Sequence, residues 1–305
     1  MLQPRTAIGI LATATTVGVL VVEFFRARRR SPFPPHGWLG IVALASAEWM
    51  LFLRIEPVTT YFTPIAWSAY ILIVDAAVFA LTGRSRLRDA PTTVARMALL
   101  SIPLWLIFEA YNFRLSGWTY VGVPHEWPAA LLGYGWSFAT ITPAIFQTSD
   151  LVQALLPPAP VQPWSISRAA ENVTMACGAL CLIVPLLVPG KLAPYMVPLL
   201  WIGFVLLIDP LNKRLALPSF LGDLSEGFAR RLYGFLWAGW ICGWLWEFWN
   251  NWAGAKWHYT FPMFQQWKIF EMPAPGYLGF LPFAMECFTM YVAAAWLAGW
   301  LKRVK

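Results

Sequence analysis

Residues Gly239–Pro262 read GWICGWLWEFWNNWAGAKWHYTFP, an apolar helical segment that runs into an aromatic loop. The segment carries a single acid, Glu247, and Asn250 follows three residues later. At about 100° per residue, one stripe of this helix holds Trp237, Trp240, Trp244 and Glu247. An acid inside an apolar helix is costly to bury, so the pattern indicates a functional carboxylate in a membrane protein.

The same motif occurs earlier in the chain. Glu109, Asn112 and Trp118-Thr119-Tyr120 precede Pro124, just as Glu247, Asn250 and Trp257-His258-Tyr259 precede Pro262. A second pair of matching segments leads to an acid at the same spacing: Tyr61-Phe-Thr-Pro64-Ile-Ala-Trp67 before Asp75, and Tyr195-Met-Val-Pro198-Leu-Leu-Trp201 before Asp209. These matches predict an internal duplication of a four-helix unit.

Composition places the chain in the membrane. Of the 305 residues 59% are hydrophobic and 12% are charged, about half the charged fraction of a soluble domain. Apolar runs of roughly 17–24 residues recur along the chain, as a bilayer core requires. We expect an all-α polytopic membrane protein with about nine transmembrane helices, near residues 7–25, 37–54, 61–83, 97–113, 128–147, 169–189, 192–209, 232–250 and 277–300.

The positions of the basic residues predict the topology. With the N-terminus outside and the C-terminus cytoplasmic, only six of the 22 basic residues lie outside: Arg5, Arg54, Arg114, Lys191, Lys256 and Lys268. The net charge of +7 therefore reads as a topology signal, and we expect no nucleic-acid partner. The short loops favour a bacterial inner (cytoplasmic) membrane.

The predicted organisation has four parts. Residues 1–36 form an N-terminal anchor helix and a basic linker, and 37–155 form the first four-helix repeat. Residues 156–168 form a Pro-rich cytoplasmic linker, and 169–305 form the second four-helix repeat. Because each unit crosses the membrane an even number of times, the two repeats are expected to be parallel, related by an axis along the membrane normal.

Four acids are candidate catalytic residues: Glu247, Glu109, Glu286 and Asp75. An acid buried against tryptophan favours its protonated form and can donate a proton at neutral pH. The alternative is that Glu247 and Glu109 cap a loop or pair with Lys256 or Arg114. For Asp75 and Asp209 the alternative is a structural hydrogen bond between helices.

The candidate substrate-binding residues are Trp237, Trp240, Trp244, Asn250, Asn112, Trp257 and Tyr259. The asparagines lie one helical turn after the acids and are expected to orient them by hydrogen bonding. The indoles would line an apolar pocket and stabilise a carbocation, although an interfacial aromatic belt explains Trp and Tyr equally well. Gly239 and Gly243 are expected to form a helix-packing contact.

No metal or cofactor site is expected. The four cysteines fall within predicted membrane segments, and the three histidines are scattered. The sequence contains no Gly-rich phosphate loop and no haem-attachment motif.

The segment from Glu247 through Trp257 and Tyr259 to Gly276-Tyr277-Leu278-Gly279 and Pro282-Phe-Ala-Met-Glu286 resembles the integral-membrane lycopene cyclases and the related membrane carotenoid hydratases. Those cyclases carry a Pro-x-Glu-Glu segment. Here a single Glu follows one residue later, the first repeat has Pro143-Ala-Ile-Phe146 without an acid, and each unit has an additional helix. The resemblance implies a non-redox acid/base reaction on a polyisoprenoid, with Glu247 and Glu286 as the acids.

Three functions fit the sequence. The first is an enzyme that cyclises, hydrates or isomerises a lipophilic, isoprenoid-type substrate taken from the membrane lipids. The second is a transporter for a small cation or lipid. The third is a structural or assembly subunit that binds a membrane-protein partner through the outer loop 251–277.

Overall fold

The computed structural model describes residues 4–157 and 160–301. The first three residues of the predicted anchor, two residues of the predicted linker and the basic C-terminal end (302–305) lie outside the described residues.

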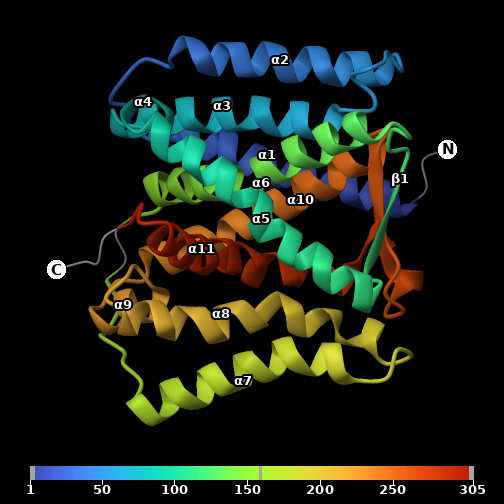
Figure 1. Cartoon of the computed structure of the whole chain (residues 1–305). Helices are drawn as coiled ribbons and strands as arrows, with labels where there is room; N and C mark the ends of the chain where they lie inside the picture. Colours follow the sequence, from blue (N-terminus) through green and yellow to red (C-terminus); the bar gives the residue numbers. More distant parts are fainter. Residues whose placement is uncertain (1–3, 158–159, 302–305) are drawn as a thin grey trace.

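Nine long helices make up most of this part of the chain (Figure 1). They are α1 (Pro4–Arg26), α2 (Pro35–Phe52), α3 (Phe62–Thr82), α5 (Pro91–Leu115), α6 (Trp127–Leu155), α7 (Arg168–Leu187), α8 (Val197–Arg214), α10 (Arg230–Trp252) and α11 (Phe280–Leu297). Each of the nine predicted apolar segments overlaps one of them, which confirms the all-α prediction.

Proline and glycine set several helix boundaries. Pro35 and Pro91 stand at the start of α2 and α5, where a proline costs no hydrogen bond because the first helical N–H groups have no partner in the helix. Helix α3 ends at Thr82 and is followed by Gly83, whose φ of +77° is the left-handed conformation that glycine adopts without strain.

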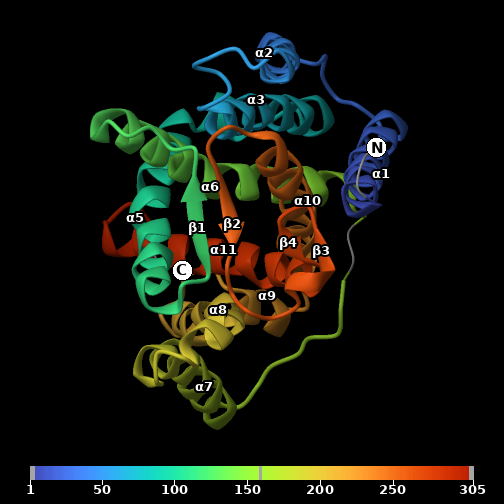
Figure 2. The same ribbon diagram turned by 90° about the vertical axis from the view of Figure 1, so that its right-hand side faces the viewer.

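The helices of the two halves pack in matching pairs. Helix α3 packs against α2 and α6, and α8 packs against α7 and α11. Helix α5 packs against α6 as α10 does against α11, and α6 and α10 meet in the centre. Figures 1 and 2 show α2 and α7 on opposite outer faces of the bundle, with α1 beside α10.

Short elements close the two ends of the bundle. At one end, strands β1 (Trp118–Val121) and β2 (Lys256–Tyr259) pair antiparallel. At the other end lie the short helices α4 (Arg86–Asp89) and α9 (Phe220–Ser225). The remaining short elements are η1 (Ala193–Met196), η2 (Gln265–Trp267), β3 (Lys268–Ile269), β4 (Met272–Pro273) and η3 (Ala274–Gly279).

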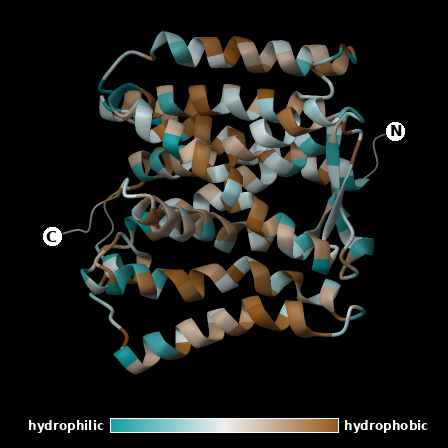
Figure 3. Cartoon of the chain, viewed as in Figure 1, coloured by the Kyte–Doolittle hydropathy of each residue, from teal (hydrophilic) through white to brown (hydrophobic). Residues whose placement is uncertain are grey.

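The bundle has the surface of a membrane protein. Seven of its helical segments are long and apolar enough to cross a membrane, and α2 and the Trp-rich α10 are not among these seven. In Figure 3 hydrophobic residues dominate the middle of the outer helices, and hydrophilic residues gather at their ends and in the connections. Large apolar side chains such as Leu39 on α2 and Leu180 on α7 are exposed, which suits contact with lipid rather than water.

Two glycines let α10 approach α11 closely. A Cβ atom at Gly239 would lie 2.1 Å from the carbonyl oxygen of Phe280, and one at Gly243 would lie 2.4 Å from the Phe280 ring. The predicted packing contact of the Gly239 and Gly243 pair is thus confirmed.

Candidate functional site

An aromatic-walled cavity of ≈ 140 Å³ lies between the two halves of the chain, with room on the order of ten water molecules. Helices α3, α5 and α6 form its wall on one side, α10 and α11 form it on the other, and both β1 and β2 contribute. Its rings are Trp67, Trp105, Trp118, Trp201, Trp246, Trp257, Phe108, Phe138, Phe280, Phe283, Tyr61, Tyr120, Tyr134 and Tyr259.

The wall is packed across the two halves. Trp67 of α3 lies with its ring centroid 5.0 Å from Trp246 of α10, and Trp246 lies 5.7 Å from Phe283 of α11. Trp105 of α5 meets the same Phe283 at 5.8 Å. Neither half could therefore form this wall alone.

The connections at the β1–β2 end hold the wall in place. Gly122, just after β1, has φ +69°, and a Cβ atom there would lie 2.1 Å from the carbonyl oxygen of Gly254. The amide of Gly254 in turn donates to the carbonyl oxygen of Thr59, just before α3, at 2.9 Å. The two strands and the start of α3 are thus bound together beside the cavity.

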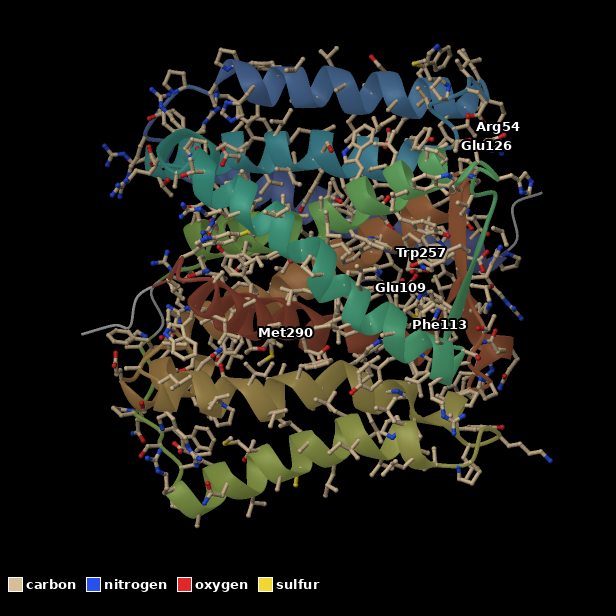
Figure 4. All side chains as sticks on the ribbon, in the orientation of Figure 1. Arg54, Glu109, Phe113, Glu126, Trp257 and Met290 are labelled. Carbon is tan, nitrogen blue, oxygen red and sulfur yellow. The ribbon has the colours of Figure 1, made fainter. Side chains whose placement is uncertain are left out.

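Glu109 of α5 is held by side chains of the cavity wall. One of its carboxylate oxygens accepts hydrogen bonds from the indole N–H groups of Trp105 (2.8 Å) and Trp118 (3.2 Å) and from the Tyr120 hydroxyl. Burial, and then the neighbouring Glu109, raise the pKa of Tyr120 well above its ordinary value, so its hydroxyl remains a proton donor. Figure 4 shows Glu109 toward the β1–β2 end of the bundle.

Glu247 of α10 has an equivalent partner but a different environment. Its side chain is completely buried, and one carboxyl oxygen accepts a hydrogen bond from the Tyr259 hydroxyl at 3.0 Å. The other oxygen makes no hydrogen bond of regular geometry among the described residues, although the Trp257 indole and the Met272 amide lie near the carboxyl group. Burial, and then Glu247, raise the pKa of Tyr259 well above its ordinary value. Each acid thus meets the tyrosine of its own Trp-x-Tyr motif, and both tyrosines line the cavity.

The two asparagines of the repeated motif bind backbone groups, so the prediction that they orient the acids is wrong. Asn112 accepts from the amides of Gly117 and Trp118 and donates to the carbonyl of Trp118. Asn250 accepts from the amide of Trp257 and donates to its carbonyl. Near a helix end, an Asn side chain competes for free backbone groups of the following loop, which explains this choice.

The strand register matches the motif. Trp118 pairs with Tyr259, and Tyr120 pairs with Trp257, on either side of a central Thr119–His258 pair. Exchanging the two Trp-x-Tyr segments therefore reproduces the same pairing.

The predicted tryptophan stripe of α10 lies away from the cavity. Trp237, Trp240 and Trp244 do not line it. Trp237 is 52% exposed, and Trp244 is buried and stacks on Tyr277 with a centroid distance of 4.0 Å. The cavity-facing tryptophan of this helix is Trp246, which sequence reasoning missed.

The other predicted acids also lie apart from the cavity wall. Glu286 of α11 is completely buried and accepts from the amide of Phe204 in α8 at 3.2 Å. Asp75 accepts from the amide of Leu87 in α4 and pairs with His36 at 3.1 Å. Asp209 accepts from two amides at the start of α9, Phe220 and Leu221. The aspartates thus hold the short helices at the end of the bundle opposite β1 and β2.

Several wall residues belong to the repeated sequence motifs but were not predicted as site residues. Trp118 and Tyr120 belong to the first copy of the motif, and Trp67 and Trp201 belong to the Tyr61 and Tyr195 repeat segments. Gln147 lies four residues after Pro143, as Glu286 does after Pro282, and both are buried with unpartnered side-chain atoms.

No group of three His, Cys, Asp or Glu side chains that could hold a metal ion occurs within residues 4–157 and 160–301. No protein-family model, curated protein or solved structure matches the chain.

Proposed function

We propose that this chain is an integral-membrane enzyme that performs acid/base chemistry on a lipophilic, isoprenoid-type substrate bound in the aromatic cavity. The observation that carries the proposal is the pair of carboxylate–tyrosine contacts, Glu109 with Tyr120 and Glu247 with Tyr259, placed against one cavity. Cyclisation, hydration and isomerisation all need a proton donor and a proton acceptor near an apolar substrate, and none of them needs a redox partner.

The proposed chemistry balances without a co-reactant in the case of isomerisation or cyclisation. One pair donates a proton to a carbon of an alkene, which leaves a carbocation. The π faces of the wall stabilise this cation, and the other pair removes a proton from a neighbouring carbon to restore a double bond. Proton exchange with water then returns both pairs to their starting states. Because the tyrosines line the cavity and the acids lie behind them, each hydroxyl would pass a proton between substrate and carboxylate.

The isoprenoid character of the substrate rests on the resemblance of the Glu247–Glu286 segment to the membrane carotenoid cyclases and hydratases. Glu286 is the third acid in this proposal. It lies one helical turn after Phe283, which lines the cavity, and one of its carboxyl oxygens has no partner among the described residues.

The number of membrane-spanning helices, their orientation and the repeat structure are also part of this proposal. We infer nine spanning helices, an external N-terminus, a cytoplasmic C-terminus and two parallel repeats after α1, in a bacterial inner membrane. The matching helix pairs and the exchangeable register of β1 and β2 support the duplication. This topology places the cavity toward the outer side, together with both Trp-x-Tyr strands.

The test is to express the chain in cells that accumulate polyisoprenoids and to compare their lipid extracts by liquid chromatography and mass spectrometry. We expect a product of unchanged or water-shifted mass, which Glu109→Gln and Glu247→Gln abolish while the variants still purify as monodisperse protein. Glu126→Gln is the matched control, because Glu126 is an exposed acid at the same end of the bundle. A product that both Gln variants retain would refute the assignment of these acids.

A further inference from the structure

Three buried donors in the cavity wall have no hydrogen-bond partner among the described residues. One is the indole N–H of Trp257, and the other two lie on α3. These are the hydroxyl of Thr63, which is 9% exposed, and the indole N–H of Trp67, which is 1% exposed. Both residues lie on α3 and line the cavity, and they are four residues apart, so they stack one turn above the other. A donor buried without a partner is destabilising, and a ligand oxygen in the cavity would relieve that cost.

A lysine in the same wall has no acidic partner. The ammonium group of Lys256 donates to the carbonyl oxygen of Asn251 at 3.2 Å, and no ion pair involves it among the described residues. The side chain is partly buried. Within the part of the chain that the structure describes, the cavity wall contains no Asp or Glu. Among the described residues, Lys256 is thus the one basic residue of this wall, and the carboxyl groups of Glu109 and Glu247 lie behind its tyrosines.

The chain just before Lys256 contacts the chain just before α3. The amide of Gly254, two residues before Lys256, donates to the carbonyl of Thr59, four residues before Thr63. Helix α3 begins at Phe62, so Thr63 lies in its first turn, where the partial positive charge of a helix favours an anion. Hydroxyl, indole N–H, ammonium and helix terminus thus all favour negatively charged oxygen.

We infer that the ligand of this cavity is an amphiphile with an anionic oxygen head group, a carboxylate or phosphate, that binds Thr63, Trp67 and Lys256 while its apolar chain lies among the rings. The inference rests on the proposed function for the identity of the cavity as the substrate site. It goes beyond that function by assigning a head group, and it predicts that a bare hydrocarbon is a poor ligand.

The experiment measures binding directly, without turnover. The detergent-purified full chain is titrated by native mass spectrometry with four probes of equal chain length: oleic acid, oleyl phosphate, oleyl alcohol and 1-octadecene. We expect one equivalent of the acid or the phosphate to bind at least about tenfold more tightly than the alkene, because charge-assisted hydrogen bonds are the strong ones. The ratio of acid to phosphate identifies the preferred head group.

Three variants locate the head group. Lys256→Met should weaken the anionic probes about tenfold and leave oleyl alcohol unchanged, whereas Thr63→Val and Trp67→Phe should weaken the alcohol as well. Lys191→Met is the control, since Lys191 lies outside the cavity wall. Equal binding of acid and alkene, or anionic binding that none of the three variants changes, would overturn the inference. Anion binding without any lipid conversion would uphold the inference and count against the proposed enzyme. Conversion of a pure hydrocarbon that oleic acid does not inhibit would support the proposed enzyme and overturn the inference.

Discussion

The sharpest prediction concerns Asn112 and Asn250, which close the turns between the two helices and their strands. Asn112 makes hydrogen bonds of 2.8 and 3.1 Å with the amides of Gly117 and Trp118 and one of 2.9 Å with the carbonyl of Trp118. Asn250 makes bonds of 3.0 and 2.9 Å with the amide and carbonyl of Trp257. At about 1 kcal/mol for each bond, Asn112→Ala should cost about 3 kcal/mol and Asn250→Ala about 2 kcal/mol.

These losses correspond to a fall in the apparent Tm of roughly 4–12 °C, since about 1 kcal/mol shifts a protein of this size class by roughly 2–4 °C. The intrinsic fluorescence of the 19 tryptophans reports unfolding in detergent without a label. Asn172→Ala is the matched control, because its side chain is exposed and accepts a single bond from Arg214, so we expect little change. Variants that keep the wild-type Tm but lose ligand binding would refute this account and restore both asparagines as substrate-binding residues.

Two further predictions follow from the same packing. Gly239→Ala should destabilise the protein by about 1–3 kcal/mol, because its methyl group would collide with the Phe280 carbonyl. The control is Gly18→Ala on α1, whose methyl group meets no atom within 4 Å and should be neutral or mildly stabilising. Equal Tm values for the two variants would contradict this prediction. The raised pKa of Tyr120 means that its stabilising contribution is complete below about pH 10 and is lost only as pH rises through the folded-state pKa. While the other tyrosines of the native protein ionise, the tyrosinate absorbance of Tyr120→Phe should therefore superimpose on that of the wild type. The two should differ by one of ten tyrosines only in denaturant, and a smaller native signal in the variant would show that Tyr120 ionises early.

The helices were predictable from the sequence because apolar length is a local property. Each of the nine predicted segments overlaps a helix, and the Gly239–Gly243 contact was predicted from spacing alone. The repeated motif also marked the ends of α5 and α10, where the two strands begin. In these places local chemistry and tertiary structure agree, so the pattern of the chain was sufficient.

The cavity was not predictable in the same way, because its wall depends on contacts between distant segments. Trp67 meets Trp246 across 179 positions of sequence, and helical periodicity cannot indicate which of the many indoles on α10 faces that partner. The stripe through Glu247 suggested Trp237, Trp240 and Trp244, whereas Trp246 lines the cavity. The prediction for the asparagines was wrong for a local reason. Each side chain could bind either the acid one helical turn before it or the free backbone groups after it, and it binds the backbone groups.

The two halves share one plan, but they hold their acids differently, and this difference supports a division of roles in the proposed reaction. Trp105 lies four residues before Glu109, and the equivalent position before Glu247 is Gly243, which packs against Phe280 and leaves no room for an indole. Glu109 therefore has three donors on one oxygen, whereas Glu247 is completely buried, accepts from Tyr259 and lies near the Trp257 indole and the Met272 amide. Three donors hold the Glu109 carboxyl in one orientation, so we propose different roles for the two acids in the reaction. The glycine that allows α10 and α11 to pack thus also makes the surroundings of the two acids unequal.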